Sequence, residues 1–158
     1  MFTNITAGEV ELLNAYQTLS PAMRRELRDY TRYLLCKQYK REVMVAVFHN
    51  KLLQNLFHSL MHLIEKEVIN LDQVAKRILQ IKELYYAIFE QVHNKYSELV
   101  EDLDSNETVA EFARHSFTNL DRALRSTNED LIRYEIHNFY QEFNKLSKKK
   151  DARNIVAV

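Results

Sequence analysis

Glycine, proline, cysteine and tryptophan are nearly missing from this 158-residue chain, which has one, one, one and none of them respectively. Hairpin turns and many α/β loops need glycine at positive φ, and no glycine follows Gly8. Phosphate-binding loops, dinucleotide fingerprints and nucleophile elbows are excluded for the same reason. The abundant Leu, Lys, Glu, Gln, Arg and Ala are good helix formers. The sequence therefore predicts a single compact, multi-helix, all-α domain that is not an enzyme.

The single cysteine, Cys36, cannot form an internal disulfide, which is typical of a reducing compartment. No apolar run approaches the roughly 18 residues that a membrane-spanning helix needs. The first residues also lack the basic-then-apolar pattern of a secretory signal. We therefore expect a cytoplasmic protein without a membrane span.

Charge is unevenly distributed although the formal net charge is zero. Residues 52–147 carry 10 basic and 16 acidic groups, whereas residues 148–158 carry 4 and 1. An acidic body argues against nucleic acid as a partner, because such binding needs a basic stripe. We interpret residues 1–147 as one helical domain and residues 148–158 as a basic, frayed C-terminal tail.

Apolar residues in the stretch 71–100 recur with helical spacing on two sides, which predicts a central helix packed on both. The first stripe contains Leu71, Val74, Ile78, Tyr85, Phe89, Val92, Tyr96 and Leu99, and the second contains Ile81, Leu84 and Ile88. The apolar run 43–48 is predicted to be deeply buried. Two further helices, over residues 108–126 and 131–146, are expected to form a long antiparallel pair.

Helix boundaries are predicted from capping residues. Ser20 and Pro21 favour a helix start, Phe48–Asn50 a bend, and Asn70 the cap of the central helix. The acidic segment 101–107 is expected to be a loop, with Ser105 or Asn106 as the next cap. Residues 126–129 predict either a kink or a capped helix start.

Two kinds of ligand site are compatible with the side chains. His58, His62 and Glu65 stand at i, i+4 and i+7, so one helical face could present them to a metal ion, with Glu90 and His93 as further ligands. The alternative for the two histidines is hydrogen bonding at the edge of the core. The numerous aromatic residues could line an apolar cavity, although aromatics at helical spacing usually form plain core.

The order of helices resembles a known family. The segments VFHNKLLQNLFHSLMHLIEKEVINLDQVAKRILQI, KELYYAIFEQVHNKYSEL and NETVAEFARHSFTNLDRALRSTNEDLIRYEI resemble the haem-less globin-type sensor domains of Gram-positive bacterial stress and sporulation proteins. The resemblance implies a globin-like fold without haem, since LDQVAKRILQ lacks a proximal histidine. It also implies a homodimer with a signalling protein as partner. A fatty acid would lie in an interior lined by Phe57, Leu60, Tyr86, Phe89, Phe117 and Leu120.

A second, shorter segment, LSPAMRRELRDYTRYLL, resembles helices that follow the DNA-binding unit of some phage-type repressors and serve dimerisation. Because this chain has no room for the DNA-binding unit, only the association role would transfer. The leading hypothesis is thus a bacterial regulatory or sensor domain that acts through protein contacts. The alternatives are a metalloprotein using His58, His62 and Glu65, and a ligand-free helical adaptor.

Overall fold

The computed structural model describes the backbone of residues 4–100 and 107–156, and the side chains of residues 4–100 and 108–148. These residues form six α-helices and no β-strand, which confirms the all-α prediction. The helices are α1 (Ala7–Thr18), α2 (Pro21–Phe48), α3 (Lys51–Ile64), α4 (Leu71–Ser97), α5 (Glu107–Ser126) and α6 (Glu129–Val156). No helix in the described part of the chain is long and apolar enough to cross a membrane.

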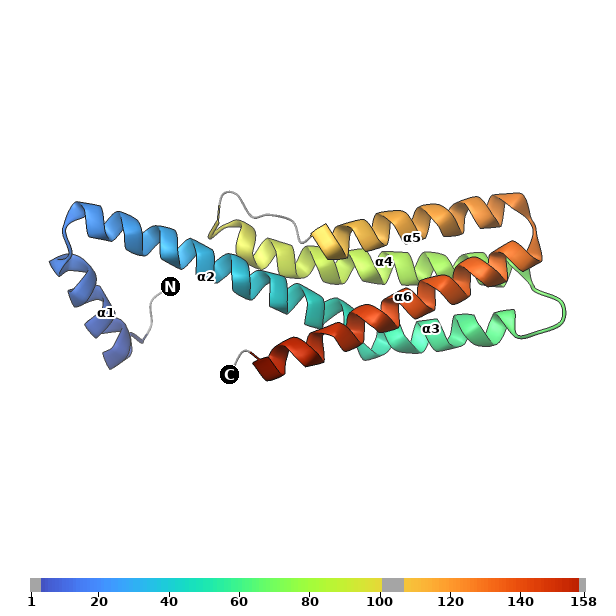
Figure 1. The fold of residues 1–158 in the computed structure, drawn as a ribbon, viewed down its shortest axis with the longest axis horizontal. Helices are drawn as coiled ribbons and strands as arrows, with labels where there is room; N and C mark the ends of the chain where they lie inside the picture. The colour runs from blue at the N-terminus through green and yellow to red at the C-terminus, as the bar shows by residue number, and fades with distance from the viewer. Residues whose placement is uncertain (1–3, 101–106, 157–158) are drawn as a thin grey trace.

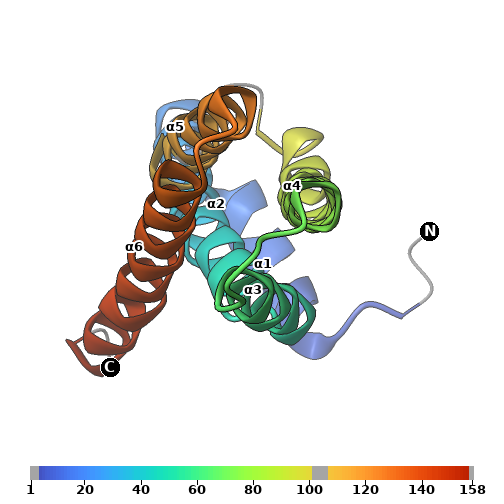
Figure 2. The same cartoon turned by 90° about the vertical axis from the view of Figure 1, so that its right-hand side faces the viewer.

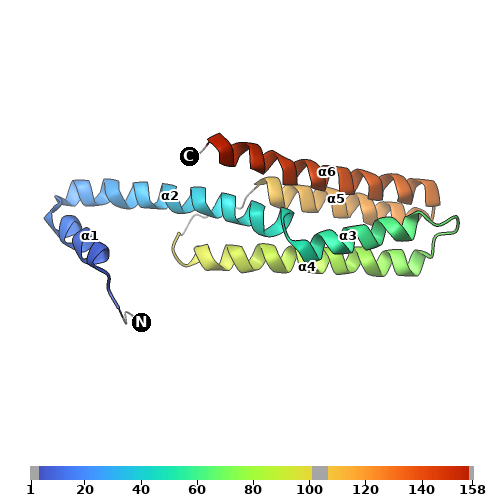
Figure 3. The ribbon, with the colours of Figure 1, turned by 90° about the horizontal axis from the view of Figure 1, so that it is seen from below.

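Four helical rods surround the core, and one of the rods consists of two helices in succession. One rod is formed by the second half of α2 followed by α3, and the other three rods are α4, α5 and α6 (Figure 1). α4 contacts α2, α3 and α5, while α6 contacts α2, α3 and α5, so neighbouring rods pack around the bundle (Figure 2). α5 and α6 are antiparallel, as the sequence predicts (Figure 3). The globin-like arrangement stays a prediction.

Two helix starts and one bend agree with the predictions from the sequence. Ser20 Oγ accepts a hydrogen bond from the Met23 amide at 3.3 Å, and Pro21 is the first residue of α2. The Asn50 side chain caps α3 after α2 ends at Phe48, which confirms the predicted bend. Asn70 caps α4 in the same way. Short polar side chains therefore set these boundaries without any glycine.

The turn between α5 and α6 needs a positive φ, and Thr127 supplies it at 54°. A β-branched residue is strained in this region, where glycine is usual. Asn128 Oδ1 accepts hydrogen bonds from the amides of Asp130 and Leu131 at 3.0 and 3.2 Å. Of the two predictions for residues 126–129, the capped helix start is confirmed. The predicted loop at 101–107 and its caps, Ser105 and Asn106, fall outside the described residues except for Glu107, where α5 begins.

Three details of the predicted helices were wrong. Val45 is 43 % exposed, because consecutive residues of a helix point in different directions and the run 43–48 cannot all face inward. Leu99 is exposed beyond the end of α4, and Val100 is buried instead, its amide bonded to the Tyr96 carbonyl. The last helix continues past residue 146 to Val156. The frayed tail stays a prediction, since side chains from residue 149 onward are not described.

The core is centred on α4, as its two apolar stripes predict. Val74, Ile78, Ile81, Tyr85 and Tyr96 are all buried along this helix. Tyr85 is fully buried and its ring contacts those of Phe48, Tyr86, Phe112 and Phe117. Its hydroxyl donates a hydrogen bond to the Val109 carbonyl at 2.7 Å, which joins α4 to the first turn of α5.

Tyr85→Phe is expected to lower the free energy of unfolding by about 1 kcal/mol, the usual net value of one buried hydrogen bond. Burial raises the pKa of the Tyr85 hydroxyl above its ordinary value of 10.0, and the neighbouring Tyr86 raises it further by a smaller amount. The folded state therefore keeps the proton that the unfolded state loses, and stability contributed by Tyr85 falls as the pH rises above 10.0. Urea denaturation from neutral to alkaline pH should show a shallower decline for Tyr85→Phe. Tyr134→Phe, at an exposed site on α6, is the control and should match the wild type.

Candidate functional site

The six residues predicted to line a ligand cavity lie in two environments. Phe57, Leu60, Phe117 and Leu120 are buried in the bundle core. Tyr86 and Phe89, on α4, are half-buried at its margin. The Tyr86 ring contacts that of Phe117 with centroids 6.0 Å apart, whereas the Phe89 ring stacks on His93.

Aromatic rings fill the centre of the bundle around Phe57. Its ring centroid lies 4.8 Å from that of Phe139 and 4.5 Å from that of Phe143. Phe139 in turn contacts Phe117 at 5.3 Å, so the rings of α3, α5 and α6 interlock. Edge-to-face and offset contacts of this kind stabilise a core beyond the area they bury.

The histidines of the alternative metal site lie apart from one another. His58 Nε2 is 3.1 Å from the Tyr140 hydroxyl, which places the ring at the edge of the core. His62 Nδ1 is 3.7 Å from a Glu65 carboxylate oxygen, and both side chains are largely exposed. His93, on α4, has its ring next to those of Tyr39 and Phe89. Among the described residues, no group of three or more His, Cys, Asp or Glu side chains is placed to hold a metal ion.

A shallow groove of about 180 Å³ lies between α5 and α6. Its lining includes none of the six predicted cavity residues and consists of Phe112, His115, Ser116, Asn119, Glu135, Asn138, Phe139 and Glu142. Within it, the Asn119 amide nitrogen and His115 Nε2 are 3.2 Å apart. The groove has an aromatic floor and a polar rim with two carboxylates.

A polar cluster joins α2 to the C-terminal half of α4. The buried Tyr96 hydroxyl donates to the Glu42 carboxylate and accepts a hydrogen bond from Gln38 Nε2 at 2.9 Å. Lys95 Nζ contacts the same carboxylate at 2.8 Å. The hydrogen bond from Lys95 and, to a smaller extent, that from Tyr96 lower the pKa of the Glu42 carboxyl below its usual value. All of the cluster's polar groups are paired with each other, so we interpret the cluster as a structural contact that holds α2 against α4.

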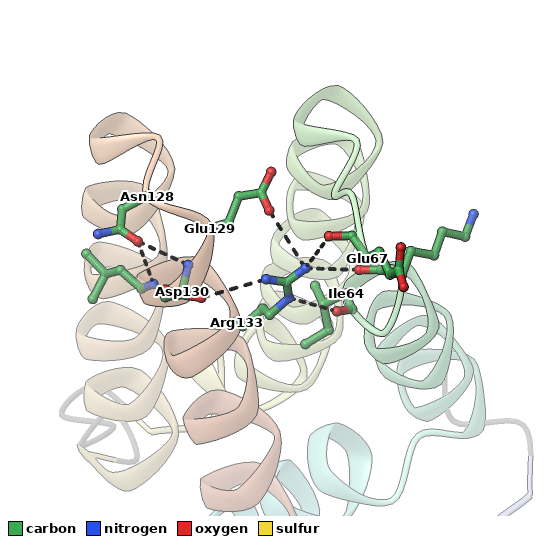
Figure 4. Close-up of polar contacts among 8 residues, drawn as sticks. Ile64, Glu67, Asn128, Glu129, Asp130 and Arg133 are labelled. Carbon is green, nitrogen blue, oxygen red and sulfur yellow. Dashed lines mark hydrogen bonds and ion pairs between the residues drawn. The ribbon is translucent and has the colours of Figure 1, made fainter.

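Arg133 of α6 ties together the two turns at the opposite end of the bundle (Figure 4). Its guanidinium donates hydrogen bonds to the carbonyls of Ile64, Lys66 and Glu67 at 3.1, 2.9 and 3.1 Å. It also lies 3.7 Å from the Glu129 carboxylate. A cation at the C-terminus of α3 satisfies carbonyls that the helix leaves without amide partners. This feature too is structural.

Eight of the fourteen exposed large apolar side chains in the described part of the chain lie in a projection that we call the arm, defined as residues 4–34. It comprises α1 and the first half of α2, and it extends beyond the end of the bundle (Figures 1 and 3). No side chain between residues 4 and 38 is buried, and the first buried one is Tyr39. Its exposed large apolar residues are Ile5, Val10, Leu12, Leu13, Met23, Tyr30, Tyr33 and Leu34. Exposed apolar side chains gathered in this way are typical of interaction surfaces.

The polar contacts between α1 and α2 lie at the turn that joins them. Arg24 Nε donates to the Tyr16 carbonyl at 3.0 Å, and the guanidinium lies over the Tyr16 ring. The N-terminus of α1 is closed by a capping box between Thr6 and Glu9. α1 is therefore a well-capped helix whose apolar side chains have almost nothing to pack against within this chain.

From the sequence, the segment LSPAMRRELRDYTRYLL, which contains the stripe Leu27, Tyr30 and Leu34, was expected to have an association role only by resemblance, and no exposed arm was predicted. An apolar stripe has the same spacing whether it packs inside the chain or against another molecule. One signal was present, because the stripe lies beside four arginines at 24, 25, 28 and 32, a density unusual next to a core. The arm is a candidate functional surface, and its exposure was not predicted from the sequence.

Comparison with known proteins gives no further guidance: no family model, curated protein or solved structure matches this chain.

Proposed function

We propose that this chain is a non-catalytic regulatory module that acts by binding protein through its arm. The observation that carries the proposal is the set of large apolar side chains that the arm leaves in solvent. Tyr30 and Tyr33, whose rings stack at 6.2 Å between centroids, are the type of residue enriched in protein interfaces. The helical bundle then serves as the body that holds the arm in position.

The roles of sensor and adaptor differ only in whether the bundle interior takes a ligand. The rings of Phe57 and Phe117 both contact that of Phe139, so a fatty acid would have to displace packed aromatic side chains. This geometry supports the adaptor role. The fatty-acid site stays a prediction, and native mass spectrometry of protein purified without added lipid tests it. A mass adduct of fatty-acid size would favour the sensor.

Site-specific photo-crosslinking in the native host tests the proposed function. A photoreactive phenylalanine analogue replaces Tyr33 on the arm, 59 % exposed, or Tyr134 on α6, 65 % exposed, as the matched control. We expect a discrete protein adduct from position 33 that position 134 does not give, with the captured protein identified by peptide mass spectrometry. Equal crosslinking from both positions, or none from position 33, would contradict the proposal.

A further inference from the structure

We propose that the protein bound by the arm is a second copy of this chain, and that two arms pair around a two-fold axis with α1 of each copy on α2 of the other. This inference rests on the proposed function and names the partner of the same surface. Four properties of the arm support it: the direction of its apolar stripe, the length of α1, the distribution of charge and the area available.

The apolar stripe of the arm faces away from the bundle of its own chain. Leu27, Tyr30 and Leu34 share one side of α2, being three and four residues apart. The side that enters the core has the same spacing but contains Arg28, Arg32 and then Tyr39. The stripe is thus not the continuation of the core face, and the bundle cannot cover it without breaking α2.

α1 needs a packing partner that this chain does not provide. It has 12 residues and none of them is buried. Isolated helices of fewer than about 12–15 residues are marginal in water, and most helical stability in proteins comes from packing an apolar face. Its contact with α2 is made by Arg24 at the turn and leaves Leu12 and Leu13 exposed. A second copy would supply the missing contact surface.

The charges of the arm are self-complementary, as a two-fold interface requires. α1 carries two acidic residues, Glu9 and Glu11, and no basic one, for a net charge of −2. Residues 21–34 carry four arginines against Glu26 and Asp29, for a net charge of +2. Placing α1 of one copy on α2 of the other brings opposite charges together twice, whereas pairing like helices would not.

The area exposed on the arm also suits a dimer. Its eight large apolar side chains are each about half exposed and together leave on the order of 800 Å² in solvent. A standard specific interface buries roughly 800 Å² on each partner. The arm is therefore large enough to form a stable interface with its own copy and needs no surface from the bundle.

Sedimentation velocity of the full chain over a range of concentrations is the test. We expect the wild type to sediment as a dimer, and Leu13→Glu and Tyr30→Glu each to raise the dimer dissociation constant at least about 100-fold, since each buries an unpaired carboxylate. Leu79→Glu is the matched control, because Leu79 on α4 is 53 % exposed and Leu13 is 52 % exposed. It should leave the dimer intact. Because Leu13 and Tyr30 are exposed in the single chain, circular dichroism should show both arm variants with a folded bundle and a loss of helix no larger than the 12 residues of α1.

A monomeric wild type, or arm variants that still form the dimer, would overturn the second-copy proposal. The crosslink at position 33 then separates this failure from that of the proposed function. An adduct between two copies of the chain supports both proposals. An adduct with a different protein from a monomeric chain overturns the second copy while leaving arm-mediated regulation standing, and no adduct from a monomeric chain overturns both.

Discussion

Phe57→Ala should lower the free energy of unfolding by about 3–5 kcal/mol, the largest effect expected from any single change to this chain. The Phe57 side chain is fully buried and its ring contacts those of Phe139, Tyr140 and Phe143. Truncation removes these contacts and leaves a cavity between α3 and α6. Since a domain of this size has a total stability of about 5–15 kcal/mol, the variant should unfold at much lower urea concentration.

Phe89→Ala provides the control for that experiment. Phe89 is half-buried, and its stacking partner is His93 at the margin of the bundle. We expect a loss of about 1–2 kcal/mol, the value of partial burial without a closed cavity. If both variants lost the same free energy, the packing around Phe57 would be loose, and the prediction of a ligand-filled interior would gain support.

Arg133→Met should lower the free energy of unfolding by about 2–3 kcal/mol, the range for hydrogen bonds made by a charged group. The substitution keeps the apolar stem but removes the donors to the carbonyls of Ile64, Lys66 and Glu67. Those carbonyls lie at the end of α3 and in the turn that follows it (Figure 4). Amide hydrogen exchange should therefore accelerate most at residues 64–70, with urea denaturation giving the global loss.

The matched substitution is Arg122→Met, at an exposed position on α5. It should change the free energy of unfolding by less than about 0.5 kcal/mol, as surface substitutions usually do. Arg133→Lys should recover only part of the loss, because an ammonium group cannot reach three carbonyls with the fixed fork of a guanidinium. An Arg133→Met variant as stable as Arg122→Met would show that solvent replaces these hydrogen bonds without cost.

Local signals in the sequence were enough to predict the helices and most of their boundaries. Ser20 and Asn70 were expected to begin helices and Asn50 to lie in a bend, and each accepts a hydrogen bond from an amide of the helix that follows. These interactions join residues three positions apart, so the sequence contains them directly. The two-sided pattern of the central helix was equally local and predicted its position in the core.

Contacts between distant segments could not be predicted in this way. Arg133 and Ile64 are 69 residues apart, and nothing in the neighbourhood of either identifies the other. Thr127 adopts a positive φ without being glycine, so the usual signal for that turn was missing. The six predicted cavity residues came from a resemblance, and their spacing alone does not distinguish a filled core from a cavity.

The exposure of the arm was not predicted for a related reason. Periodicity states which residues share a face but not whether another part of the chain covers that face. Tyr30 and Tyr39 are both aromatic residues of α2, yet Tyr30 is exposed and Tyr39 is buried against α4. Tyr30 lies in the arm, and it also lies on a different side of α2 from Tyr39, which faces the core.

The uninterrupted course of α2 has a mechanical consequence. Its first half lies in the arm, and its second half brings Tyr39, Val43 and Val47 into the core. A helix of 28 residues spans roughly 42 Å, and after Pro21 no proline or glycine weakens it. A continuous helix of this kind is stiff. If a bound molecule rotates the arm, the part of α2 in the core is therefore expected to rotate against α4. The hydrogen bonds from Gln38 to Tyr96 and from Tyr96 to Glu42 join α2 to α4 and would oppose that rotation.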